Sequence, residues 1–172
     1  MLPRSRVCRD EMTAFEIRPT VTDDLETLWE FQAMAAYEQD VAVAKSIPMV
    51  ASYLDDWPRP DDFGFVAEQN GLAIGAAWAR QFSPQGKPGV YCEERTPEMS
   101  IGVRASVRGQ GVGESLIRTL TAEAARLGLR VCLNVRQTNP ARRLYERLGF
   151  QVLPGMTVTN RVGGLSDWML WH

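Results

Sequence analysis

The feature that most limits the possible fold and ligand of this 172-residue chain is a glycine-rich turn between a predicted strand and a predicted helix. The strand covers Met99–Val103, the turn reads Arg108-Gly-Gln-Gly-Val-Gly113, and an apolar stripe with helical spacing begins at Leu116. Glycines let a backbone turn tightly and approach a ligand closely. The first N–H groups of a helix lack intrahelical partners and lie at the positive end of its dipole. The unit therefore predicts a site for a phosphate or pyrophosphate group.

Two other phosphate-binding motifs do not fit this turn. A dinucleotide fingerprint needs Gly-x-Gly-x-x-Gly, but position 114 is Glu, and a P-loop needs Gly-Lys-Ser/Thr, which the chain lacks. The turn alone would also fit a plain connection between a strand and a helix that binds nothing. A second motif is needed to choose between these interpretations.

The second motif is the stretch Asn139-Pro-Ala-Arg-Arg-Leu-Tyr-Glu-Arg-Leu-Gly-Phe150. With the glycine turn, it resembles the GNAT superfamily of N-acetyltransferases. That family has Arg/Gln-x-x-Gly-x-Gly/Ala after its fourth strand and an Asn…Tyr…Gly-Phe helix after its fifth. The matching residues are Arg108, Gly111, Gly113, Asn139, Tyr145, Gly149 and Phe150. Ala141 comes one place earlier than the family's usual small residue. The resemblance covers residues 15–172, but only 97–150 carry specific motifs.

The resemblance implies an α/β (α+β) fold of one domain over residues 15–172. Its sheet would be mixed and mostly antiparallel, with splayed fourth and fifth strands, and helices would flank it. The hydrophobic patterns give the same order of elements. Helices are predicted over 23–36, over 45–55, from about 112 to Gly128 and from Asn139 to Gly149. Strands are predicted over 15–18, 63–69, 72–82, 99–103, 131–135, 150–158 and 166–171. Residues 1–14 are predicted to be a disordered extension, within which Met12 is a candidate start.

The resemblance also implies that acetyl-CoA binds between the fourth and fifth strands. Backbone groups of Ile101, Gly102 and Val103 would bind the pantetheine arm, and Asn139 would bind it from the far side. Asn139 could equally be a plain helix N-cap. The pyrophosphate would lie on Arg108, Gly109, Gln110, Gly111, Val112 and Gly113. Arg142 completes the predicted cofactor-binding set.

Two residues are predicted to be catalytic. By resemblance, Tyr145 would protonate the leaving thiolate, although a tyrosine at this position could also be a packing residue. Acyl transfer to an amine also needs a base, because an ammonium is not nucleophilic, and Glu98 at the start of the fourth strand is the candidate. The alternative for Glu98 is a solvent-exposed residue at a strand end. His172 is interpreted as a bystander.

The predicted function is transfer of an acetyl group to a primary amine of a small molecule or peptide, by direct attack in a ternary complex. The alternative is a non-catalytic acyl-CoA-binding or regulatory module on the same fold. Aromatic and acidic residues near the expected acceptor pocket would suit a cationic amine, but could also be core aromatics and a solvated acidic loop. They are Trp29, Tyr37, Tyr53, Trp57, Phe82 and Tyr91, with Asp55, Asp56, Asp61, Asp62, Glu93 and Glu94.

Composition narrows the classes of partner. A net charge of −2 supplies no broad basic face, so nucleic acid is not an expected partner. Cys8, Cys92 and Cys132 lack CxxC spacing and His172 is the single histidine, so no metal site is expected. The scattered cysteines suit a reducing compartment, so a cytoplasmic location is expected. No run of 18 apolar residues is available to span a membrane. Dimerisation is common in the family that the chain resembles, and a homodimer is compatible with the sequence.

Overall fold

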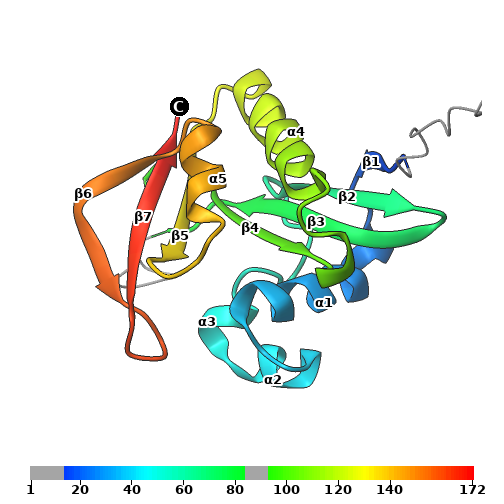
Figure 1. Cartoon of the computed structure of the whole chain (residues 1–172), viewed down its shortest axis with the longest axis horizontal. Helices are drawn as coiled ribbons and strands as arrows, with labels where there is room; N and C mark the ends of the chain where they lie inside the picture. The colour runs from blue at the N-terminus through cyan, green and yellow to red at the C-terminus, as the bar shows by residue number, and fades with distance from the viewer. Residues whose placement is uncertain (1–13, 84–92) are drawn as a thin grey trace, which may run out of the picture.

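A computed structural model describes residues 14–83 and 93–172. The sheet has seven strands in the order β1-β2-β3-β4-β5-β7-β6 (Figure 1). Their bounds are β1 (Glu16–Pro19), β2 (Phe63–Gln69), β3 (Leu72–Arg80), β4 (Glu98–Val103), β5 (Val131–Arg136), β6 (Gln151–Thr159) and β7 (Leu165–Trp171). The β4–β5 pair is parallel and all other neighbouring pairs are antiparallel. The predicted fold class, one α/β domain with a mixed and mostly antiparallel sheet, is confirmed.

The helices follow the predicted order but not all of the predicted bounds. They are α1 (Leu25–Ala36), α2 (Val41–Ser46), α3 (Pro48–Ala51), α4 (Val112–Arg126) and α5 (Arg142–Arg147). Short 3-10 turns, η1 (Thr22–Asp24) and η2 (Ala105–Val107), precede α1 and α4. The single helix predicted over 45–55 is wrong, because Ile47 before Pro48 is extended and separates α2 from α3. The predictions for residues 1–13, including a start at Met12, lie outside the described residues.

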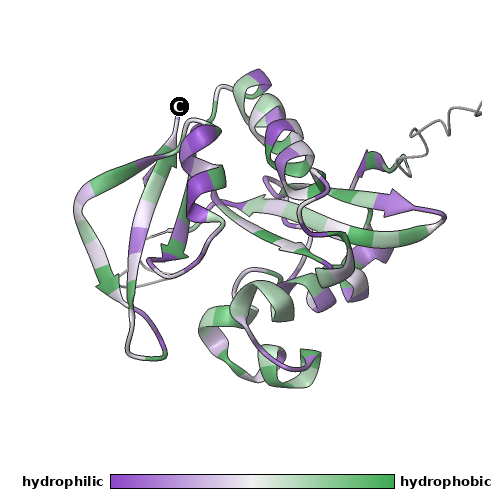
Figure 2. Cartoon of the chain, in the orientation of Figure 1, coloured by the Kyte–Doolittle hydropathy of each residue, from purple (hydrophilic) through white to green (hydrophobic). Residues whose placement is uncertain are grey.

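Helices cover both faces of the sheet. Figure 1 shows α4 on one side of β2–β4 and α1, α2 and α3 on the other. Leu116, Ile117 and Leu120 of α4 are buried against the sheet in the larger core, and Leu28 and Phe31 of α1 belong to a second core on the opposite face. In Figure 2 the central strands are largely apolar, whereas α5 carries mostly hydrophilic residues. The two faces of β4 therefore meet different helices.

The parallel strands β4 and β5 meet at one end and then diverge. The described pairing aligns Glu98 with Cys132, at the beginning of both strands. Beyond that point β4 stays paired with β3 as far as Val103, and β5 stays paired with β7 as far as Arg136. The predicted splay is thus present, and backbone N–H and C=O groups of β4 are available along the gap. An open strand edge of this kind can pair with an extended ligand.

The turn between β2 and β3 confirms the tight hairpin that the sequence predicts, because Asn70 and Gly71 have φ values of 53° and 75°.

The structure also shows a close helix–strand contact that was not predicted. Gly102 lies where α1 crosses β4, and a Cβ at this position would be 2.6 Å from the carbonyl oxygen of Phe31. Glycine therefore allows α1 to lie directly on β4. Among the described residues, no helix has the length and apolar character needed to cross a membrane.

Candidate active site

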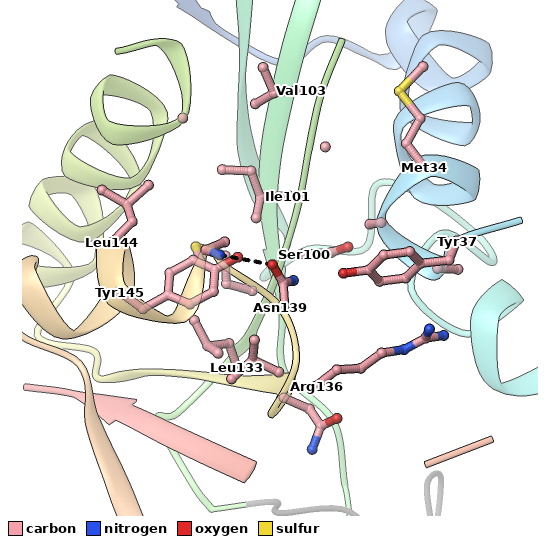
Figure 3. A pocket seen from close by; sticks show the side chains of 18 of the residues that line it. Met34, Tyr37, Ser100, Ile101, Val103, Leu133, Arg136, Asn139, Leu144 and Tyr145 are labelled. Atoms are coloured by element: carbon pink, nitrogen blue, oxygen red, sulfur yellow. Dashed lines mark hydrogen bonds between the residues drawn. The ribbon is translucent and has the colours of Figure 1, made fainter. Parts of the chain in front are cut away.

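A cavity of about 1160 Å³ opens where β4 and β5 diverge. Its walls come from β4, β5, the end of α1, the glycine turn and the start of α5. In Figure 3, Tyr37 and Tyr145 project toward its centre from opposite sides, with Ser100 and Asn139 between them. The cavity thus joins segments that lie more than one hundred positions apart in the sequence.

Most of the predicted site residues line this one cavity. They are Glu98, Ile101, Gly102, Val103, Arg108, Gly109, Gly111, Gly113, Asn139 and Tyr145. The remaining predicted residues, Gln110, Val112 and Arg142, are not part of the lining. The Gln110 side chain donates to the carbonyl of Ser106 at 3.2 Å, and the Val112 side chain is buried in the core.

Arg142 forms ion pairs with Asp167 and Glu146 and does not line the cavity. Its guanidinium donates to the Asp167 carboxylate at 2.5 Å and to Glu146 at 3.3 Å. The pKa of Asp167 is lowered chiefly by the hydrogen bond from the Thr157 hydroxyl, with Gln137 and Arg142 adding to the effect against the desolvation of the carboxyl group. The structure therefore places Arg142, at the start of α5, in a polar network around Asp167, and Arg142 does not line the cavity.

The glycine turn has the geometry of an anion cradle. Gly109 and Gly111 have φ values of 76° and 85°, which glycine adopts without strain. A Cβ added to either residue would meet no atom within 4 Å, so the space above both is open. The N–H of Ser115 bonds the carbonyl of Gly111 at 3.0 Å, which leaves the N–H groups of Val112 and Gly113 in the unpaired first turn of α4. The backbone of this turn fits a pyrophosphate.

Asn139 combines two predicted roles. Its side-chain oxygen accepts a hydrogen bond from the N–H of Ala141 at 2.9 Å, so it caps the turn that leads into α5. Its Nδ2 group has no hydrogen-bond partner among residues 14–83 and 93–172, and the side chain points into the cavity (Figure 3). The cap fixes the amide orientation and leaves a donor for a ligand.

Tyr145 lies on α5 with only 7% of its surface exposed. Burial raises the pKa of its phenol to about 12, because desolvation disfavours the phenolate, and Tyr37 across the cavity adds to the shift. The ring packs edge-on against Phe150 at 5.9 Å between centroids. Its hydroxyl makes no hydrogen bond to the described residues. Tyr145 is therefore a protonated donor at neutral pH, facing a cavity.

Glu98 is buried rather than exposed. Only 2% of its surface is accessible, so the alternative of a solvent-exposed residue at a strand end is wrong. Its carboxylate accepts a hydrogen bond from the Tyr53 hydroxyl, and both residues line the cavity. A buried carboxylate needs such donors to offset its desolvation.

A buried arginine anchors the segment that carries Tyr53. Arg80 is fully buried and donates to the carbonyls of Ser52 and Asp55, each at 2.8 Å. It also forms an ion pair with Asp62 at 2.5 Å. These bonds fix the backbone on both sides of Tyr53 and hence the position of its hydroxyl beside Glu98.

Sequence reasoning missed a second polar pair next to Glu98. The Ser100 hydroxyl donates to the Gln32 side chain at 2.8 Å, and Gln32 donates in turn to the carbonyl of Val50 at 2.9 Å. Ser100 lies two residues after Glu98, so both face α1. The alternation along the strand could have predicted that Ser100 lies on the same face as Glu98. Nothing in the sequence pairs Ser100 with Gln32, which lies 68 positions earlier on a predicted helix.

Most of the predicted acceptor residues lie outside the cavity. Tyr37 and Tyr53 line it, whereas Trp29, Trp57 and Phe82 are buried in packing positions and Tyr91 lies outside the described residues. Among the predicted acids, Asp62 pairs with Arg80, Glu93 pairs with Arg130, and Asp55, Asp56, Asp61 and Glu94 are exposed and absent from the lining. An acidic wall for the acceptor is therefore not formed by these residues.

The wall beyond α1 is basic instead. The Arg136 guanidinium lies 4.1 Å from the centre of the Tyr37 ring. Arg161, in the turn between β6 and β7, donates to the carbonyl of Ala36 at 3.1 Å and forms an ion pair with Glu38. These contacts join the end of α1 to β5 and to the β6–β7 hairpin across the cavity.

Comparisons with known proteins agree with this geometry. The model of the acetyltransferase (GNAT) family matches residues 22–150, and no curated protein matches the chain. The ribosomal-protein-S18-alanine N-acetyltransferase from Escherichia coli is 21% identical with a TM-score of 0.66, over 92% of this chain and 93% of that one. A putative acetyltransferase, yncA, from Salmonella typhimurium, solved with acetyl-CoA, is 24% identical with a TM-score of 0.66, over 92% of each chain.

A third structure, an N-acetyltransferase from Staphylococcus aureus Mu50, is 25% identical with a TM-score of 0.67, over 91% of this chain and 97% of that one. Each of these likenesses covers more than nine tenths of this chain. The family match covers most of the chain and contains both the glycine turn and Tyr145. The chain therefore belongs to the acetyltransferase (GNAT) family.

Proposed function

We propose that this protein is an acetyl-CoA-dependent N-acetyltransferase that acts on a primary amine by direct attack in a ternary complex. One observation carries the proposal: a buried carboxylate, Glu98, and a protonated phenol, Tyr145, line the same cavity as an anion-binding turn. Transfer from a thioester to an amine needs a base, an acid and a site for the phosphates of the donor, and the cavity offers all three.

The donor half of the cavity would use backbone groups. The turn from Arg108 to Gly113 would hold the pyrophosphate, and the open edge of β4 at Ile101–Val103 would pair with the pantetheine arm. The free amide donor of Asn139 would bind that arm from the α5 side. When bound, acetyl-CoA supplies a thioester at the junction between β4 and β5. A backbone N–H of β4 would polarise the thioester carbonyl.

The catalytic half would move two protons. Glu98 takes a proton from the acceptor ammonium, and the free amine then forms a bond to the carbonyl carbon of the thioester. As the bond from that carbon to sulfur breaks, Tyr145 gives its proton to the sulfur, and the products are an amide and a thiol. Tyr145 can do so because its high pKa keeps it protonated. The second proton released from the nitrogen restores Tyr145 through solvent.

A thiol-release assay with purified protein tests this proposal. The amine panel would contain polyamines, amino acids, aminoglycosides and peptides, because the structural relatives include a ribosomal-protein-S18-alanine N-acetyltransferase and a spermidine N-acetyltransferase. We expect thiol release with one of these classes. Tyr145→Phe should release thiol about 10²-fold more slowly while binding CoA normally, since a general acid contributes 10²–10⁴-fold.

The alternative is a non-catalytic acyl-CoA-binding module. It predicts acetyl-CoA binding without thiol release for every amine tested, and that result would overturn the catalytic proposal. An unchanged rate in Tyr145→Phe would instead exclude Tyr145 as the acid.

A further inference from the structure

Resting on the proposed function, we infer that the acceptor amine carries a carboxylate and that Arg136 binds it on the α1 side of the cavity. Arg136 is then a specificity-determining residue, and the acceptor is a zwitterion rather than a simple polyamine. Three features of Arg136 support this inference: the face of the sheet on which it lies, its lack of an ionic partner in residues 14–83 and 93–172, and its position along β5 relative to Glu98.

The alternation of side chains along β5 places Arg136 on the acceptor face. Leu133 and Val135 belong to the core beneath α4, so the residues between and after them face the opposite side. Cys132 confirms this, because it packs in a different cluster with Trp168. Arg136 follows the same alternation and meets Tyr37 at the end of α1, as Figure 3 shows. The glycine turn, in contrast, leads into α4 on the other face.

The charge balance of the cavity singles out Arg136. Among the described residues, four arginines line it, at positions 108, 136, 147 and 161. Arg147 pairs with Glu114 and Arg161 pairs with Glu38. Arg108 lies on the predicted pyrophosphate turn. Arg136 is half-buried and has no carboxylate partner within the described parts of the chain. One cation on the acceptor face is therefore left for an anion of the ligand.

The contact with Tyr37 orients Arg136 without occupying its donors. A guanidinium that lies over an aromatic ring interacts through its flat face, and its N–H groups stay free at the edge. Such an edge matches the two oxygens of a carboxylate in a bidentate pair. Asn134 lies two residues earlier on the same face, is exposed and also lines the cavity. Its amide could support the same anion.

The spacing from Glu98 limits the shape of the acceptor. Glu98 lies opposite Cys132, and the backbone of Arg136 is four residues further along β5, about 13 Å from that of Cys132 at 3.3 Å per residue. Both side chains reach into the cavity and shorten this separation. Because the Arg136 guanidinium is held on Tyr37 at the end of α1, we expect a longer acceptor than an α-amino acid, whose amine and carboxylate are attached to one carbon. The acceptor should therefore be an ω-amino acid or a peptide with a carboxylate several bonds from its amine.

Matched acceptors test this inference. The series glycine, 4-aminobutanoate, 5-aminopentanoate and 6-aminohexanoate would be compared with pentylamine, which has the same amine but no carboxylate. We expect kcat/KM for the longer zwitterions to exceed that for pentylamine and for glycine by at least tenfold. Arg136→Gln should abolish that preference by raising KM for the zwitterions, with the rate for pentylamine and the affinity for CoA unchanged. Arg143→Gln, an exposed arginine outside the cavity, is the matched control and should keep the preference.

A binding experiment decides the inference even without turnover. 5-Acetamidopentanoate has the carboxylate but no reactive amine, and its binding would be measured by calorimetry with and without CoA. Binding that Arg136→Gln weakens at least tenfold supports the inference, even if no amine is acetylated and the proposed function fails. No binding to the wild-type protein, or equal binding to Arg136→Gln, overturns it. Weaker CoA binding by Arg136→Gln also overturns it, because Arg136 would then serve the donor phosphates.

Discussion

The hydroxyl of Tyr53 donates a hydrogen bond to the buried carboxylate of Glu98. The two residues are 45 positions apart, and the bond joins the segment after α3 to the first residue of β4. Because Glu98 is buried and lines the cavity, this bond helps to fix the orientation of its carboxylate there. Tyr53 is thus a positioning residue for the proposed base.

Replacing Tyr53 with Phe tests that positioning role. The aromatic ring would keep its edge contact with Phe82, while Glu98 would lose a donor. We expect kcat to fall by about tenfold or more, since a hydrogen bond to a charged group is worth about 1.5–3 kcal/mol. The KM for acetyl-CoA should stay the same, because the donor turn is untouched. Thiol-release kinetics give both values, and an unchanged kcat would remove Tyr53 from the catalytic account.

The buried ion pair behind Tyr53 predicts a large loss of stability. Asp62→Asn leaves the fully buried Arg80 without its counter-charge, and breaking such a pair costs about 3–5 kcal/mol. Urea denaturation would measure the free energy of unfolding. Asp61→Asn, at the exposed neighbouring position, is the matched control and should change stability by less than about 0.5 kcal/mol. Equal stability of the two variants would contradict the anchoring role of Arg80.

The raised pKa of Tyr145 predicts a specific loss of stability in alkali. An unfolded tyrosine ionises near pH 10, whereas the folded residue stays protonated to about pH 12, so the unfolded state binds fewer protons between these values. Stability from Tyr145 is therefore complete below pH 10 and declines as the pH rises toward 12. At pH 11 the loss is about 1.4 kcal/mol, from 1.36 kcal/mol per pKa unit.

Tyr145→Phe isolates this effect from the other tyrosines. The difference in unfolding free energy between wild type and variant should shift by that amount between pH 8 and pH 11, in favour of the variant. Chemical denaturation at both pH values would measure it. A difference that does not change with pH would show that the Tyr145 phenol ionises alike in both states.

Local sequence signals predicted the elements of the fold that depend on neighbouring residues. The Asn70-Gly71 turn, the glycine turn before α4 and the order of strands and helices all follow from spacing within a few residues. The division between α2 and α3 was missed because the effect of Pro48 on Ile47 was not considered. The splay of β4 and β5 came from the family resemblance, since no local pattern encodes where two strands separate.

The parts of the cavity that sequence reasoning missed depend on long-range contacts. Ser100 and Gln32 meet across 68 positions, and Arg161 reaches Ala36 across 125. The sequence left open whether the aspartates near position 60 form an acidic acceptor wall or a solvated acidic loop. The structure fits the loop, because Asp62 pairs with Arg80 and Asp55, Asp56 and Asp61 are exposed. The burial of Glu98 could not be predicted from the sequence either, since strand ends are exposed in some folds and enclosed in others.

Calorimetry with acetyl-CoA tests whether the glycine turn holds the donor. We expect saturable binding of one acetyl-CoA per chain, and binding at least 100-fold weaker in Gly111→Glu, whose side chain would occupy the open space above the turn. Gly155→Glu is the matched control, because Gly155 also has a positive φ and open space but lies on β6 outside the cavity. It should bind like the wild type. Absence of binding to the wild type, or equal binding by Gly111→Glu, would contradict the account.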